Sequence, residues 1–85
     1  MASYRLLIKP SAAKELEAVS PKDRRRIAIK IQHLASEPRP AGTEKLSAQE
    51  KYRLRQGNYR VLYSVDDAKL AVTIVKIGHR RDVYR

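Results

Sequence analysis

The pair Gly57-Asn58 separates two segments in which polar and apolar residues alternate, residues 51–56 and 59–65. Alternation with a period of two is typical of β-strands, and such a pair between two alternating segments is typical of a two-residue hairpin turn. A turn of this length also determines which residues of the two strands face each other. We therefore expect a β-hairpin in which Arg55 lies opposite Arg60.

The expected hairpin has one apolar face and one basic face, because side chains two residues apart on a strand share a face. The face that we assign to the core carries Tyr52, Leu54, Tyr59, Val61, Tyr63 and Val65. The opposite face carries Arg53, Arg55 and Arg60. No carboxylate within residues 51–64 offsets their mutual repulsion. Because a guanidinium matches two phosphate oxygens, this cluster indicates a phosphate-binding surface. The alternative is a solvated face that charge keeps soluble.

Two helices are expected before the hairpin. Ser11 can cap a short helix over residues 11–19. Ser20 can cap a second helix with Pro21 at its first position. Apolar residues follow in this second helix at steps of four and three, the spacing of one buried stripe. The stripe consists of Ile27, Ile31 and Leu34. Since almost no loop joins the helices, we expect an antiparallel helical hairpin.

Two further strands complete the expected fold. Residues 3–9 alternate and predict a strand, which Pro10 ends. Residues 69–77 are rich in Leu, Val, Ile and Thr, as central strands are, and Gly78 ends this strand. The order is strand, helix, helix, strand, strand, strand. It predicts an α+β fold with a helical hairpin on one face of an antiparallel sheet, within a single domain of residues 1–85.

The charge of the chain indicates a polyanionic partner. Nineteen Lys and Arg against nine Asp and Glu give a formal net charge of +10. The chain has no cysteine and two histidines, so we expect neither a structural metal nor another cofactor. No apolar run approaches the roughly 18 residues of a membrane span, and the first residues do not read as a signal peptide. We therefore expect a cytoplasmic protein with no membrane partner.

The final segment, residues 79–85, adds basic and aromatic groups to the candidate site. Histidine is the side-chain type in this segment that can exchange a proton near neutral pH, so His79 is the candidate for that role. Tyr84 can donate a hydrogen bond or stack on a base. Taken singly, a histidine after a strand and a terminal tyrosine are more often structural. The arginines of this segment are Arg80, Arg81 and Arg85.

Three segments together resemble the RelE family of toxins, within the wider RelE/ParE superfamily. They are YRLLIKPSAAKEL near the start, KYRLRQGNYRVLYSV in the hairpin and VKIGHRRDVYR at the end. The resemblance covers nearly the whole chain. It implies a curved antiparallel sheet backed by a helical hairpin. It also implies an enzyme that cuts messenger RNA in the ribosomal A site and that a cognate, acidic antitoxin holds inactive.

The resemblance assigns roles by position. Arg53 and Arg55 match two basic residues of the family's first hairpin strand, and Arg60 matches its phosphate-stabilising arginine. Arg80 matches the arginine of the closing segment, and Tyr84 matches a tyrosine that stacks on or orients the substrate. The register of the hairpin and the resemblance therefore lead separately to Arg53, Arg55 and Arg60.

The implied reaction is attack of a ribose 2′-hydroxyl on the adjacent phosphate, without metal or cofactor. Some members of the family carry lysines where this chain has Arg53 and Arg55, and arginine does not give up its proton. Our hypothesis is that His79 acts as the general base instead. Further contacts to RNA are expected from Lys51, Arg81 and Arg85.

Two other functions fit the same sequence. The first is inhibition of DNA gyrase by a ParE-like toxin without nuclease activity; the combination of Arg60, Arg80 and Tyr84 argues against it. The second is a basic RNA-binding protein, or a toxin that has lost its activity.

Overall fold

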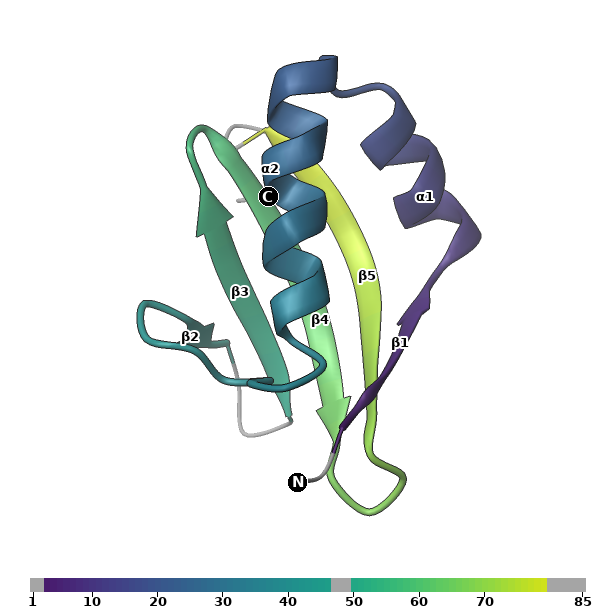
Figure 1. Cartoon of the computed structure of the whole chain (residues 1–85), viewed down its shortest axis with the longest axis vertical. Coiled ribbons are helices and arrows are strands. Elements are labelled where there is room, and N and C mark those ends of the chain that lie inside the picture. The colour runs from purple at the N-terminus through teal and green to yellow at the C-terminus, as the bar shows by residue number, and fades with distance from the viewer. Residues whose placement is uncertain (1–2, 47–49, 80–85) are drawn as a thin grey trace.

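The structure, a computed structural model, describes residues 3–46 and 50–79. Within these residues two helices lie on one face of a five-stranded sheet with the strand order β1-β5-β4-β3-β2 (Figure 1). The elements are β1 (Arg5–Ile8), α1 (Pro10–Glu17), α2 (Pro21–His33), β2 (Glu44–Lys45), β3 (Lys51–Gln56), β4 (Tyr59–Asp66) and β5 (Ala71–His79). The α+β class and the predicted order of the helices and main strands are confirmed. Within the described residues, no helix is long and apolar enough to cross a membrane.

The β3–β4 hairpin has the register that its two-residue turn predicts, with Arg55 opposite Arg60. Gly57 has a φ of 59°, a left-handed conformation that glycine adopts without steric cost. The predicted core face is also confirmed, since Tyr59 packs partly buried against the core and the other five residues of that face are buried. Burial of alternate residues on both strands therefore holds the hairpin in one register.

The two helices run in opposite directions, α1 against β5 and α2 against β3 (Figure 1). The predicted stripe of α2 is confirmed, because Ile27, Ile31 and Leu34 are all buried in the core. Ser20 is the N-cap residue of α2, as predicted, but its side chain makes no capping hydrogen bond and donates to Oδ2 of Asp23 at 3.2 Å instead. Ser11 is not a cap, because α1 begins at Pro10. A proline suits the first turn of a helix, where its missing N–H would have no helical acceptor.

The sheet is mixed, and not wholly antiparallel as expected. β1 pairs with β5 in parallel, with Leu6 opposite Val72. Alternation along a strand reports which side chains are buried but not the direction of its partner, so the sequence pattern did not reveal this pairing. The short strand β2 was not predicted at all. It has only two residues, both exposed, and pairs antiparallel with β3.

β5 contains an irregularity that changes which side chains face the helices. Leu62 pairs with Lys76 and Tyr63 pairs with Ile74, so Val75 has no counterpart on β4. One extra residue on a strand is a β-bulge, and it turns the following residues to the other face. The strand also continues through Gly78 to His79, beyond the predicted end at residue 77.

A side chain of helix α1 accepts a hydrogen bond from the part of the β5 edge that β1 does not reach. β1 pairs with β5 only as far as Ile74. Beyond it, the backbone N–H of Ile77 donates to Oε1 of Glu15 at 2.9 Å, and Nζ of Lys76 lies 3.4 Å from Oε2 of the same carboxylate. A charged side chain on an otherwise open edge also discourages pairing with another chain.

Arg39 ties the loop after α2 to the sheet. Its guanidinium contacts Oδ2 of Asp67 at 2.8 Å and Oε2 of Glu50 at 2.9 Å, and its Nε donates to the hydroxyl of Tyr52 at 2.7 Å. Tyr4 donates to Asp67 as well, at 2.6 Å, and Tyr52 donates to Glu50. Because this network joins the loop to β3 and to the β4–β5 turn, it positions the chain that leads into β2.

We predict that the contribution of this network to stability disappears in acid. The hydrogen bond from Tyr52, followed by that from Arg39, lowers the pKa of Glu50. The hydrogen bond from Arg39, followed by that from Tyr4, lowers the pKa of Asp67. A carboxyl with a lowered folded-state pKa stabilises the fold above its ordinary pKa of about 4, and this effect is lost as the pH falls through the folded-state value.

The measurement is urea unfolding of the wild-type chain and of Arg39→Met near pH 7 and near pH 3. The variant should be less stable near pH 7, and the difference should shrink near pH 3. Arg5→Met removes an exposed arginine of β1 and serves as the control. A difference between Arg39→Met and wild type that does not change with pH would contradict this prediction.

Candidate nucleic-acid interface

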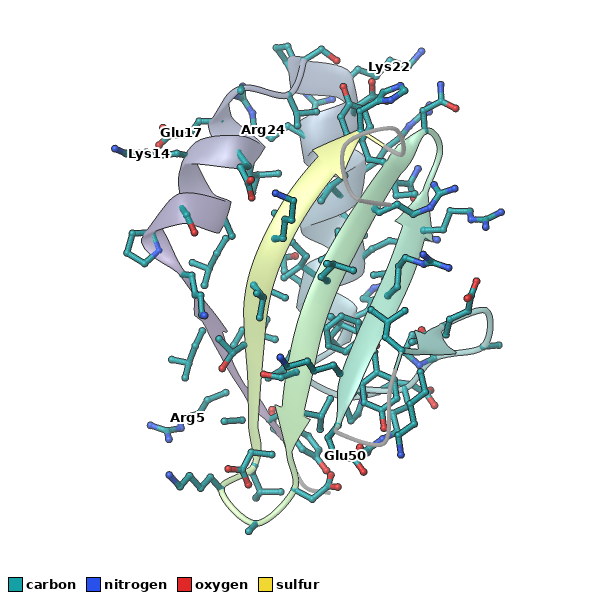
Figure 2. The ribbon with its side chains drawn as sticks, turned by 180° about the vertical axis from the view of Figure 1, so that it is seen from behind. Arg5, Lys14, Glu17, Lys22, Arg24 and Glu50 are labelled. Carbon is teal, nitrogen blue, oxygen red and sulfur yellow. The ribbon has the colours of Figure 1, made fainter. Side chains whose placement is uncertain are left out.

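The arginine face, which we define as Arg53, Arg55 and Arg60, lies on the side of the sheet opposite the core. Arg55 and Arg60 are directly opposite each other on β3 and β4, as predicted. Figure 2 shows the sheet from this side, with α2 behind it. The three arginines differ in exposure and in contacts, so each is described separately.

Arg60 is the most enclosed member of the arginine face, with 5% of its surface exposed. Its Nη1 donates to the carbonyl of Tyr59 at 3.3 Å. On β4 it lies between Arg55 on one side and Gly78 of β5 on the other. Glycine places no side chain beside the arginine. Burial restricts the guanidinium and removes it largely from water, and both effects strengthen its interaction with an anion.

Arg53 has a carboxylate partner that the sequence analysis did not foresee. Oε2 of Glu44 lies 2.7 Å from Nη2 of Arg53, because β2 places Glu44 directly opposite it. The expectation that no acid offsets the arginine face is therefore wrong for this position. It was drawn from residues 51–64, whereas the carboxylate comes from β2. Arg55, by contrast, is exposed.

His79 is not brought to the arginine face. It pairs with Tyr59, whose ring packs against the core, and the two ring centroids lie 5.7 Å apart with an edge-on geometry of 79°. Gly78 pairs with Arg60, so the neighbouring His79 points to the other side of the sheet. There it lines a recess of about 260 Å³ beside Glu15 of α1.

Of the other predicted contacts, Lys51 is exposed and shares the side of Arg53, two residues before it on β3. Four predicted residues lie outside the described part of the chain: Arg80, Arg81, Tyr84 and Arg85.

Lys30 is a cation that the sequence analysis missed. It is exposed on α2, and its Nζ donates to the carbonyl of Arg55 at 3.1 Å. A cleft of about 490 Å³ is lined by Lys30 together with Glu44, Arg53 and Arg55. Lys30 lies 25 residues from Arg55 in the chain, so the hairpin pattern carries no signal for it.

Residues 6–84 match the family described as ParE toxin of type II toxin-antitoxin system, parDE. The chain belongs to this toxin family. The match runs from β1 past the end of β5 and includes the whole arginine face. It confirms the placement in the RelE/ParE superfamily that the sequence resemblance implied.

Toxins with the RelE name resemble this ParE-family chain in sequence and in structure. Toxin RelG of Mycobacterium tuberculosis is 44% identical over 34 residues, which cover 40% of this chain and 39% of that protein. The match thus spans well under half of this curated relative's length. A structure of the RelBE2 toxin–antitoxin complex from M. tuberculosis is 25% identical, with a TM-score of 0.80 and coverage of 94% of both chains. The archaeal RelE–RelB complex from Pyrococcus horikoshii is 28% identical, with a TM-score of 0.81, covering 92% of this chain and 96% of that chain.

Proposed function

We propose that this toxin is a ribosome-dependent endoribonuclease that cuts messenger RNA in the ribosomal A site and so stops translation. The observation that carries the proposal is the placement of Arg60, buried to 5% exposure and directly opposite the exposed Arg55 on a basic sheet face. Arg60 has a restricted guanidinium and Arg55 has one that faces solvent. Together they suit a phosphate that approaches the sheet from solvent. The site would act in the cytoplasm, where translation occurs.

In the proposed reaction the ribose 2′-oxygen forms a bond to the adjacent phosphorus, and the bond from phosphorus to the 5′-oxygen of the next nucleotide breaks. The 2′-hydroxyl gives its proton to a base, and the leaving 5′-oxygen receives one. The products carry a 2′,3′-cyclic phosphate and a 5′-hydroxyl. Arg60 and Arg55 would stabilise the charge that develops on the phosphoryl oxygens. Arg80 and Tyr84 take their roles from the family resemblance, and the ribosome would hold the nucleotides in line.

The test is primer extension on a messenger RNA in a reconstituted translation reaction, with and without ribosomes. We expect cuts within ribosome-occupied codons only. An intact message in the presence of folded protein would refute the nuclease proposal.

The hypothesis that His79 is the base conflicts with its position on the other side of the sheet from Arg55 and Arg60, and His79→Gln tests it. If His79 takes the proton, single-turnover cleavage should fall by roughly 100-fold or more. The control is Tyr59→Leu, which removes the ring that His79 contacts but no titrating group near pH 7. A loss below about tenfold, equal in both variants, would make His79 a packing partner of Tyr59 and remove it from the mechanism.

Inhibition of DNA gyrase is the second candidate function, because the matching family bears the ParE name. A supercoiling assay with purified gyrase separates the two candidates. Inhibition there, together with uncut messenger RNA, would favour this second function. An effect in neither assay and no growth arrest on expression would leave a non-catalytic RNA-binding protein.

An antitoxin is the proposed protein partner, since the similar solved structures include toxin–antitoxin complexes. With a net charge of +10 on this chain, we expect an acidic, amphipathic antitoxin segment that covers the arginine face. Raising the salt from about 0.05 M to about 0.5 M should weaken binding at least about tenfold, because exposed charges are screened. Calorimetry at the two salt concentrations measures this, and equal affinities would contradict an electrostatic contact.

A further inference from the structure

A cleft beside β3 extends the basic surface around the edge of the sheet. Within the described residues, β2 pairs with β3 only at Tyr52 and Arg53. The edge of β3 beyond this pairing, toward the Gly57 turn, borders the cleft of about 490 Å³. α2 contributes Lys30 to its wall, and β2 lies beside β3 (Figure 1). The volume falls within the range of small-ligand sites, about 300–1,000 Å³.

The charges of the cleft favour an anion. Its lining contains three cations, Lys30, Arg53 and Arg55, against the single carboxylate of Glu44. Lys30 uses one hydrogen-bond donor on the carbonyl of Arg55. Because an ammonium has three donors, two can still reach a ligand in the cleft while the first holds the side chain in place.

Glu44 occupies a position that a phosphate can take. Its carboxylate lies 2.7 Å from Arg53. The Glu44 side chain is 56% exposed and the Arg53 side chain 15% exposed, so water reaches the carboxylate. Water at the carboxylate weakens the ion pair, whereas a phosphate presents two or more oxygens to the planar guanidinium fork. An incoming phosphate can therefore replace Glu44 on Arg53 without leaving a buried charge behind.

We propose that this cleft is a phosphate subsite for RNA, in which Lys30 binds the phosphate and Glu44 is an internal competitor that the phosphate displaces from Arg53. The inference rests on the proposed function. Arg53 and Arg55 belong both to the arginine face and to the cleft, so one RNA backbone can continue from the first surface into the second. RNA fits this continuity better than an acidic peptide does, because phosphates recur regularly along its backbone and each can pair with a guanidinium fork.

Two substitutions in the cleft should change RNA affinity in opposite directions. The probe is a dye-labelled RNA of about 12 nucleotides with 2′-O-methyl groups, which cannot be cut, and fluorescence anisotropy follows its binding over a series of salt concentrations. Lys30→Gln should weaken binding about threefold to tenfold and reduce the slope of log affinity against log salt by about 0.7. Glu44→Gln should strengthen binding about threefold to tenfold, because a carboxylate then no longer competes with the phosphate for Arg53.

Matched controls distinguish an effect of the cleft from an effect of the net charge of the chain. Lys22→Gln removes another exposed lysine of α2, and Glu17→Gln removes an exposed carboxylate of α1. Figure 2 places both controls near the end of the molecule where α1 leads into α2, away from β2. Each should change affinity less than about twofold. Lys30→Arg keeps the cation and should bind like the wild-type chain, which preserves the test if Lys30→Gln does not fold.

Equal losses of RNA affinity in Lys30→Gln and Lys22→Gln would contradict the proposed subsite. Weaker RNA binding by Glu44→Gln would contradict it as well. Binding of an acidic peptide in the cleft with no binding of RNA would also overturn it, in favour of a protein partner. Failure of the nuclease proposal is a separate result, because the RNA affinities of these five variants are measured without cleavage and decide the subsite whether or not the message is cut.

Discussion

Replacing Arg60 with alanine is expected to lower messenger RNA cleavage about 100-fold to 1,000-fold, the usual loss when one preorganised donor to a developing charge is removed. The structural reason is the burial of Arg60 and its place between Arg55 and Gly78. A guanidinium that the protein already holds in position needs no reorganisation when charge develops on the phosphate. The measurement is single-turnover primer extension with ribosomes at saturating toxin.

Two further variants separate charge from packing at this position, because a buried arginine also packs through its stem. Arg60→Met keeps most of the stem and loses the charge, so it should be as inactive as alanine. Arg60→Lys keeps a charge but loses the bidentate fork, so it should recover only part of the activity. Arg5→Ala, on exposed β1, is the control and should cleave like the wild-type chain. Cleavage by folded Arg60→Met within about threefold of wild type would exclude Arg60 from phosphate stabilisation.

Ile27→Ala should reduce the free energy of unfolding by about 2–5 kcal/mol, the range for large-to-small changes in a close-packed core. Ile27 is fully buried on α2, within the core cluster between the helices and the sheet. Domains of this size have total stabilities of only about 4–13 kcal/mol, so this loss is a large fraction of the total. Urea unfolding followed by circular dichroism measures the change.

The same helix provides a matched control for this prediction. Ile29 is two residues away and 48% exposed. Ile29→Ala should change the free energy of unfolding by no more than about 0.5 kcal/mol, because the side chain already contacts water. Equal losses in the two variants would contradict the assignment of Ile27 to the core and of Ile29 to the surface.

Local sequence signals predicted the parts of the fold that depend on neighbouring residues. The Gly57-Asn58 turn and the alternation beside it determined the register of the hairpin, and hence the pairing of Arg55 with Arg60. The apolar spacing of α2 predicted its buried stripe in the same way. These features follow from backbone periods of about two and 3.6 residues, which any short segment displays by itself.

The side of the sheet on which His79 lies could not be predicted from alternation along the strand. Val72 and Ile74 face the core, and unbroken alternation would place Lys76 and Gly78 there as well. The extra residue Val75 reverses this order, so that Ile77 and His79 turn toward the helices and Gly78 comes to lie beside Arg60. A bulge depends on the fit of two strands to each other, and β5 alone carries no clear mark of it.

The sequence by itself determined the RelE/ParE toxin superfamily, the helical stripe, and the hairpin that brings three arginines to one face. Only the tertiary structure decided the parallel pairing of β1, the ion pair between Glu44 and Arg53, and the contact of Lys30 with the edge of β3. The physical reason is sequence separation. These contacts join elements that are distant in the chain and depend on how the whole core closes, whereas turn chemistry and periodicity act between residues a few positions apart.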